Sequence, residues 1–184
     1  MKGRFFLLFI YCVLFRLPGL AQIDEASVYM QYVGKADSAI AVHDYSGAIS
    51  FLQNALREEP ANPNNLLLFS NMGMLNYYLG NDSLALESLN IAHDLAPRSV
   101  TVLLNRAKVN MGTGRYSDAL RDYTEVTDID STLVDAWIQK AMIQLKGGDV
   151  RGAEAALDRA KALEPEARET VTALAILYSK TNRP

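Results

Sequence analysis

A pattern of small residues recurs along most of this chain at a spacing close to 34 residues. Each copy has a small residue, an alanine twelve positions later, a second small residue seven positions after that, and then a helix stop. The first small residues are Ala36, Gly73, Ala107 and Ala141, separated by 37, 34 and 34 positions. The residues that complete the copies are Ala48, Ala85, Ala119 and Ala153, then Ala55, Ala92, Val126 and Ala160. Because such periods are typical of stacked helical hairpins, the sequence predicts an all-α solenoid.

Each copy also contains the signals of two antiparallel helices. A bulky residue stands four positions before each first small residue, on the same helical face, where large and small side chains can interdigitate. Short turns at 43–45, 80–82, 114–116 and 148–150 separate the two helices, and glycine in three of them can adopt the left-handed backbone that ends a helix. Pro60, Pro97 and Pro165 then separate each hairpin from the next. The bulky residues are Tyr32, Phe69, Leu103, Trp137 and Val171.

These residues together resemble the tetratricopeptide repeat. The fullest copy consists of Trp137, Ala141, Gly148, Ala153, Leu157, Ala160 and Pro165. The resemblance implies a right-handed superhelical solenoid of about four and a half repeats, formed by a single domain over residues 22–184. Its hairpins are expected at about 27–60, 64–97, 98–131 and 132–165, followed by a capping helix at 166–182. Two departures are Ser131 in place of a proline and a longer linker at 61–65.

The first 21 residues have the features of a secretory signal peptide. Lys2 and Arg4 precede an apolar run at 5–15, which is too short for an ordinary membrane span. Small residues before the end of this segment favour cleavage after Ala21; the alternative is retention as an anchor. We therefore expect a periplasmic or secreted protein with no membrane span after cleavage.

The remaining chain, residues 22–184, is acidic and contains no cysteine. It has 15 basic and 21 acidic residues, a net charge of −6, so its stability must come from helix packing and not from disulfides. Of the expected groove positions, only Lys108 and Lys146 carry positive charge, too little to neutralise a phosphate backbone. We expect no nucleic-acid partner, and the missing cysteine agrees with a bacterial periplasm.

No motif for catalysis, metal binding or a cofactor stands out. His43 and His93 are the two histidines, and neither has a ligand-like neighbour in the sequence. We predict a protein that is not an enzyme and that has no metal and no cofactor. The alternative is a hydrolase subunit whose carboxylates converge only in three dimensions, for which Asp37 and Asp135 are the candidates.

The resemblance implies that the first helix of each hairpin lines a concave groove that binds a protein or peptide. Methionine and tyrosine side chains at these positions suit such contacts, although packed core is the competing interpretation. Asn71, Asn105 and Gln139 form an amide ladder that could pair with a peptide backbone. The predicted groove residues are Ser70, Asn71, Met74, Tyr77, Tyr78, Leu104, Asn105, Lys108, Met111, Ile138, Gln139, Met142 and Leu145.

The last predicted helix has apolar residues on more than one stripe. Leu174, Leu177 and Tyr178 form a predicted docking face for a second copy of the chain or for another protein. The alternative is that the preceding hairpin covers this face. Taken together, the sequence predicts an interaction module or scaffold of the bacterial envelope. The other interpretation is a structural spacer or self-assembling rod.

Overall fold

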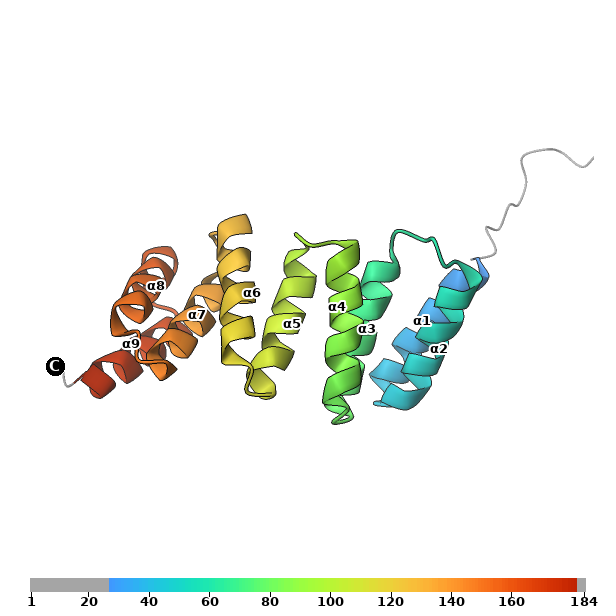
Figure 1. The fold of residues 1–184 in the computed structure, drawn as a ribbon, viewed down its shortest axis with the longest axis horizontal. Helices are drawn as coiled ribbons and strands as arrows, with labels where there is room; N and C mark the ends of the chain where they lie inside the picture. The colour runs from blue at the N-terminus through green and yellow to red at the C-terminus, as the bar shows by residue number, and fades with distance from the viewer. Residues whose placement is uncertain (1–26, 182–184) are drawn as a thin grey trace, which may run out of the picture.

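The structure is a computed structural model that describes residues 27–181. The predicted signal peptide at 1–21 lies outside these residues. In the described part, nine α-helices form a row of four antiparallel pairs followed by α9 (Figure 1). Their bounds are α1 (Val28–Ala41), α2 (Tyr45–Glu58), α3 (Asn65–Tyr78), α4 (Asp82–Leu95), α5 (Val100–Gly112), α6 (Tyr116–Ile129), α7 (Val134–Lys146), α8 (Val150–Leu163) and α9 (Arg168–Thr181).

Each helix packs mainly against its neighbours in the chain. The pairs α1–α2, α3–α4, α5–α6 and α7–α8 form the hairpins, and the second helix of each hairpin contacts the first helix of the next. First helices also meet across hairpins, α3 with α5 and α7 with α9. The predicted all-α repeat solenoid is thereby confirmed.

The recurring small residues are the points of closest helix packing. All eleven alanine and valine residues of the pattern have an exposed fraction of 0%. At the remaining position, Gly73, a Cβ atom would lie 2.5 Å from Cγ of Leu89, so only glycine fits beside that side chain. The small residues therefore recur because each hairpin has positions where the helix axes approach too closely for a larger side chain.

The helix ends follow from capping residues and prolines. The side chains of Ser27 and Ser99 accept hydrogen bonds from the backbone N–H three residues later, which satisfies a free donor at the start of α1 and α5. Asp44 and Asp149 do the same for α2 and α8. At the other ends, α2, α4 and α8 each stop two residues before a proline.

The turn inside each hairpin needs one residue with positive φ. Gly80, Gly114 and Gly148 have φ of 78°, 78° and 83°, as the sequence predicts. The equivalent residue of the first turn is His43, with φ of 61°. A side chain in this left-handed region costs about 1–2 kcal/mol relative to a right-handed conformation.

We therefore expect His43→Gly to stabilise the protein by up to about 1 kcal/mol, because it removes this backbone strain. Part of the gain is offset by loss of the hydrogen bond between His43 Nδ1 and Tyr45 Oη, 3.0 Å apart. Urea unfolding of both proteins measures the change. The reverse substitution in a later turn, Gly114→His, should destabilise the protein by a similar amount. If His43→Gly and Gly114→His lowered the free energy of unfolding equally, backbone strain at His43 would not be the explanation.

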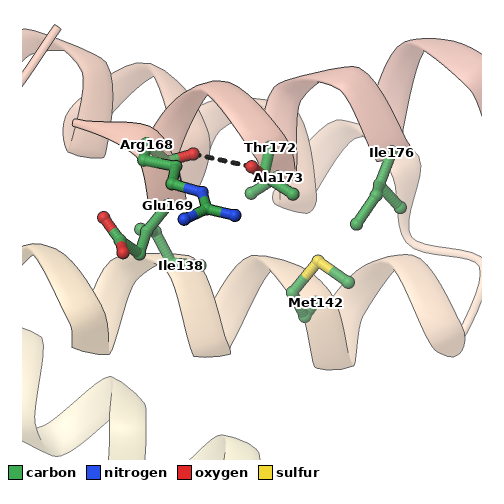
Figure 2. A pocket seen from close by; sticks show the side chains of 7 residues that line it. All are labelled: Ile138, Met142, Arg168, Glu169, Thr172, Ala173 and Ile176. Atoms are coloured by element: carbon green, nitrogen blue, oxygen red, sulfur yellow. Dashed lines mark hydrogen bonds between the residues drawn. The ribbon is translucent and has the colours of Figure 1, made fainter. Parts of the chain in front are cut away.

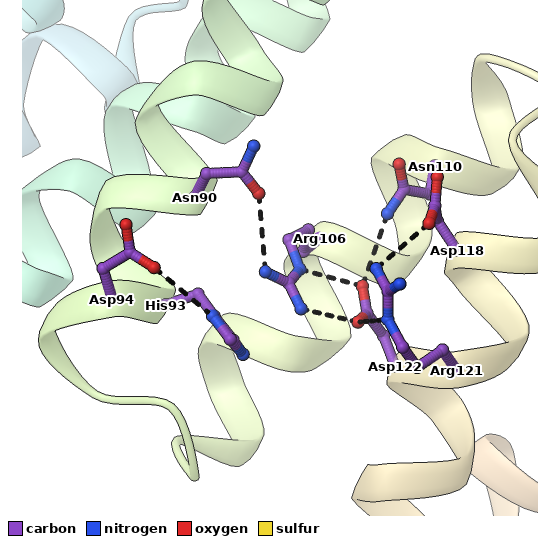
Figure 3. Close-up of polar contacts among 8 residues, drawn as sticks. All are labelled: Asn90, His93, Asp94, Arg106, Asn110, Asp118, Arg121 and Asp122. Atoms are coloured by element: carbon purple, nitrogen blue, oxygen red, sulfur yellow. Dashed lines mark hydrogen bonds and ion pairs between the residues drawn. The ribbon is translucent and has the colours of Figure 1, made fainter.

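A buried ion pair joins α5 and α6 in the middle of the array (Figure 3). Arg106 donates from Nε and Nη2 to the two carboxylate oxygens of Asp122, at 2.9 and 2.7 Å. Asn110 Nδ2 donates to the same carboxylate at 3.3 Å, and Arg106 Nη1 reaches Asn90 of α4 at 3.4 Å. Asp122 is 0% exposed, so its charge depends on these partners for stabilisation.

Candidate peptide-binding groove

The first helices of the hairpins present most of the predicted groove residues at the surface. Asn71, Tyr78 and Lys108 are exposed. Seven others are half-buried, so that one side of each remains accessible: Met74, Tyr77, Leu104, Asn105, Met111, Gln139 and Met142.

Three predicted groove residues are buried, although two of them, Ile138 and Leu145, still line the hollows described below. Ser70 is 1% exposed, and its Oγ accepts a hydrogen bond from Asn105 Nδ2 at 2.9 Å. Ile138 and Leu145 belong to the apolar core shared by α7, α8 and α9. The reason is the approach of successive first helices, α3 to α5 and α7 to α9, which covers residues on the edge of the concave stripe.

An open hollow lies between α7 and α9 (Figure 2). The side chains of Met142 on α7 and Ile176 on α9 face each other across it and give it an apolar lining. Arg168 and Glu169 stand at one end. Ile138, Thr172 and Ala173 complete the lining.

A second hollow shares Met142 with the first and extends toward the turns of the hairpins. Its lining combines apolar side chains with two lysines and a tyrosine: Met111, Tyr116, Met142, Ile143, Leu145, Lys146 and Lys180. We call these two hollows together the Met142 groove, after the residue that lines both. Helices α5, α6, α7 and α9 all contribute to it, so it is a product of the repeat packing and not of any one hairpin.

The end of the Met142 groove nearest the turns carries a contact between Lys146 and Tyr116. Lys146 Nζ donates a hydrogen bond to Tyr116 Oη at 2.6 Å and lies 3.9 Å from the centre of the phenol ring. The ring attracts the ammonium group through its negative face, and the hydroxyl fixes its direction.

An aromatic cluster occupies the equivalent region of the preceding hairpins. The rings of Tyr45 and Tyr78 are 5.6 Å apart, and those of Tyr77 and Tyr78 are 6.1 Å apart. Lys108 Nζ lies 5.8 Å from the Tyr78 ring centre. Tyr77 also packs against Gly112, where the phenol leaves no room for a Cβ atom. Tyr77 thus has a packing role in addition to its place beside the groove.

Several residues of the Met142 groove were missed by the sequence-based prediction, notably Tyr116, Arg168, Ile176 and Lys180. The period itself contained the signal for two of them. Adding 34 to Met142 gives Ile176, and adding 34 to Lys146 gives Lys180. The prediction treated the last helix as a cap and did not continue the groove onto it.

The predicted docking face on α9 is not open. Leu174 is 9% exposed and Leu177 is 1% exposed, because both pack into the core formed with α7 and α8. Tyr178 is half-buried against the same core. The exposed apolar positions on α9 are instead Val171, at 53%, and Ala175. The preceding hairpin covers the predicted face, which was the alternative interpretation.

The two carboxylates that were candidates for catalysis lie on different hairpins of the described array. Asp37 and Asp135 are exposed on α1 and α7, three hairpins apart in the array. Within residues 27–181, no group of three or more His, Cys, Asp or Glu side chains is placed to hold a metal ion.

The displaced pKa values of Tyr123 and Asp130 have structural explanations outside the groove. Burial raises the pKa of Tyr123 to about 12, and the nearby charges of Asp135 and Asp122 act in the same direction. Hydrogen bonds from the side chain and backbone of Thr132 lower the pKa of Asp130, which caps the turn before α7. These groups stabilise helix packing and a linker turn.

Comparison with known proteins agrees with this architecture. A family model described as tetratricopeptide repeat matches residues 110–177. A tetratricopeptide repeat protein from Parabacteroides merdae superposes with a TM-score of 0.81 at 24% identity, over 84% of this chain and 60% of that chain. MamA from Desulfovibrio magneticus gives a TM-score of 0.76 at 17% identity, over 85% and 86% of the two chains.

Two further similarities are informative. The crystal structure of YrrB, described as a TPR protein with an unusual peptide-binding site, gives a TM-score of 0.68 at 22% identity and covers 82% of this chain and 76% of that one. A CTR9 homolog from Arabidopsis thaliana is 25% identical over 166 residues, 89% of this chain but 15% of its own length.

The fold and the groove define an α-helical repeat solenoid with a concave surface. The tetratricopeptide repeat model matches the part of the chain at 110–177, and the solved structures show that the repeat fold extends over most of the chain. None of the helices between residues 27 and 181 has the length and apolar character needed to cross a membrane.

Proposed function

We propose that this chain is a non-enzymatic interaction module of the bacterial envelope that binds a peptide segment of a partner protein in the Met142 groove. The observation that carries the proposal is the apolar hollow in which Met142 and Ile176 face each other, open to solvent and bordered by charged residues (Figure 2). An adaptable thioether beside an aliphatic side chain suits an apolar peptide side chain, and polar groups at the rim suit its backbone.

The structural neighbours are consistent with this role. YrrB is described as having a peptide-binding site, and its similarity to this chain extends over the repeat array. The envelope location rests on the signal-peptide features of residues 1–21, and the absence of cysteine from 22–184 is compatible with it.

A structural spacer or self-assembling rod is the second candidate, and one observation favours it. Val171 and Ala175 of α9 are exposed, whereas the equivalent small residues Ala107 and Ala141 are 0% exposed beneath the second helices of their hairpins. Such an open stripe could take a helix from another copy. A rod would then show a mass in light scattering that grows with concentration, and peptide binding would be absent.

The groove is tested with Met142→Ser. Pools of synthetic random octapeptides are passed over the immobilised full chain, bound peptides are identified by mass spectrometry, and their Kd values are measured by fluorescence anisotropy. Removing the Met142 thioether from the groove should weaken binding of the selected peptides about tenfold or more. An apolar side chain of this size contributes about 1.5–3 kcal/mol to binding when a ligand buries it.

The matched control is Leu84→Ser, which removes an exposed apolar side chain from α4, outside the groove. It should leave each Kd within about twofold. Equal affinities of the wild-type and Met142→Ser proteins would show that the peptide does not bind in the Met142 groove.

A further inference from the structure

The turn-side end of the Met142 groove holds two lysines that form no ion pair with a carboxylate of residues 27–181. Lys146 stands at the end of α7 and Lys180 lies in the last turn of α9, and both line the same hollow as Tyr116. The ion pairs formed between residues 27 and 181 involve neither lysine. Two ammonium groups therefore line one hollow without a counter-charge from the part of the chain that the structure describes.

Two of the donors at this end, Lys146 and Tyr116, orient each other. Tyr116 Oη accepts the hydrogen bond from Lys146 Nζ, so the hydroxyl proton of Tyr116 remains to be donated to another group. Lys146 retains two further N–H donors, and Lys180 adds three. The contact of Nζ with the Tyr116 ring, 3.9 Å from its centre, restricts the lysine before any ligand arrives. Such pre-orientation reduces the entropy lost on binding.

The nearby acid is engaged elsewhere. Asp149 borders the adjoining hollow beside Lys146, but its Oδ1 accepts from Gly152 N at 2.9 Å and its Oδ2 from Gln144 Nε2 at 3.2 Å. It serves as the cap of α8. None of the seven residues that line the lysine-bearing hollow is acidic. This local positive charge stands in a chain whose residues 22–184 carry a net charge of −6.

We infer that the turn-side end of the Met142 groove binds a carboxylate of the peptide, held by Lys146, Lys180 and Tyr116, while a neighbouring apolar side chain of that peptide lies on Met142. The inference rests on the proposed function and specifies its ligand as an acidic peptide segment. Charge complementarity selects this ligand, because an anion is the group that two unpaired ammonium groups and a phenol can satisfy together. An Asp or Glu side chain and a C-terminal carboxylate offer the same chemistry.

The experiment compares two random octapeptide pools, one with free C-terminal carboxylates and one with amidated C-termini, on the full chain. If the inference holds, selected peptides are enriched in Asp or Glu beside an apolar residue, or binders come mainly from the free-carboxylate pool. Enrichment of Asp or Glu would identify a side-chain carboxylate as the bound group, and a preference for the free-carboxylate pool would identify the C-terminal carboxylate. Kd values of resynthesised binders should rise about tenfold in Lys146→Gln/Lys180→Gln, the loss typical of hydrogen bonds to charged groups.

A charge-matched control separates local contacts from net charge. Lys35→Gln/Lys161→Gln removes the same two charges from α1 and α8, at positions that do not line the groove, and should leave Kd within about twofold. The tenfold difference should also shrink as NaCl rises from about 0.05 to about 0.5 M, because salt screens exposed charges.

Two results would overturn the inference. Suppose that peptides bind and Met142→Ser weakens them. If neither Asp, Glu nor a free C-terminus is enriched among the binders, or if Lys146→Gln/Lys180→Gln binds them equally well, the carboxylate site is wrong and the groove function stands. If no peptide from either pool binds the wild-type chain, the proposed function and the inference fail together.

Discussion

Asp122→Ala should destabilise the protein by about 3–5 kcal/mol, measured as the free energy of unfolding in urea. Asp122 is 0% exposed and accepts hydrogen bonds from two nitrogens of Arg106 and from Asn110. Removing the carboxylate leaves the Arg106 guanidinium buried between α5 and α6 without its counter-charge. The loss would consume much of the stability of an ordinary domain of this size.

Neighbouring repeats indicate how the loss can be relieved. One period before Arg106 stands Met72, and one period after Asp122 stands Ala156, both buried. The double variant Arg106→Met/Asp122→Ala uses these residues and removes both charges at once. It should be more stable than Asp122→Ala by about 2 kcal/mol or more, because no unpaired charge remains. A double variant no more stable than the single one would show that the ion pair is not the cause.

Leu89→Ala should destabilise by about 2–5 kcal/mol, the range for truncating a fully buried leucine. Leu89 is 0% exposed and packs directly over Gly73, at the contact between α3 and α4. The loss combines the transfer of apolar surface with the cavity left between two closely packed helices. Thermal or urea unfolding of the full chain measures it.

Gly73→Ala provides the matching test of this contact. In the wild-type chain its Cβ would lie 2.5 Å from Leu89 Cγ and 3.0 Å from the Ala85 carbonyl oxygen. Overpacking of this kind costs about 1–3 kcal/mol, partly offset by about 1 kcal/mol from the higher helix propensity of alanine. In the Leu89→Ala background the larger clash is gone, so Gly73→Ala should be close to neutral. Equal effects of Gly73→Ala in both backgrounds would contradict the packing explanation.

The fold could be predicted because its constraints recur. Ala107 and Ala141 mark helix contacts that each hairpin must repeat, and Gly114 and Gly148 mark backbone conformations that other residues adopt with strain. A single copy of either signal would be weak, but the small residue recurs in four copies and the turn glycine in three, and this recurrence defines the architecture. His43 shows that the turn geometry persists even where the favoured residue is absent.

The groove could be predicted only in part, because exposure depends on the curvature of the array. Ile138 and Leu145 occupy concave positions in sequence, yet the approach of α9 to α7 buries them. The same approach brings Ile176 opposite Met142. The Arg106–Asp122 pair was not predicted either, since no other repeat places opposite charges at these two positions.

The open Val171 and Ala175 stripe of α9 has a consequence for the energetics of the array. A helix sealed on one side only has fewer contacts to lose when it separates from its neighbours, so local opening should begin at α9 while the inner hairpins stay intact. Since α9 also supplies Ile176 and Lys180, opening would dismantle one wall of the Met142 groove. Occupancy of the groove and order at this end of the solenoid are therefore thermodynamically linked.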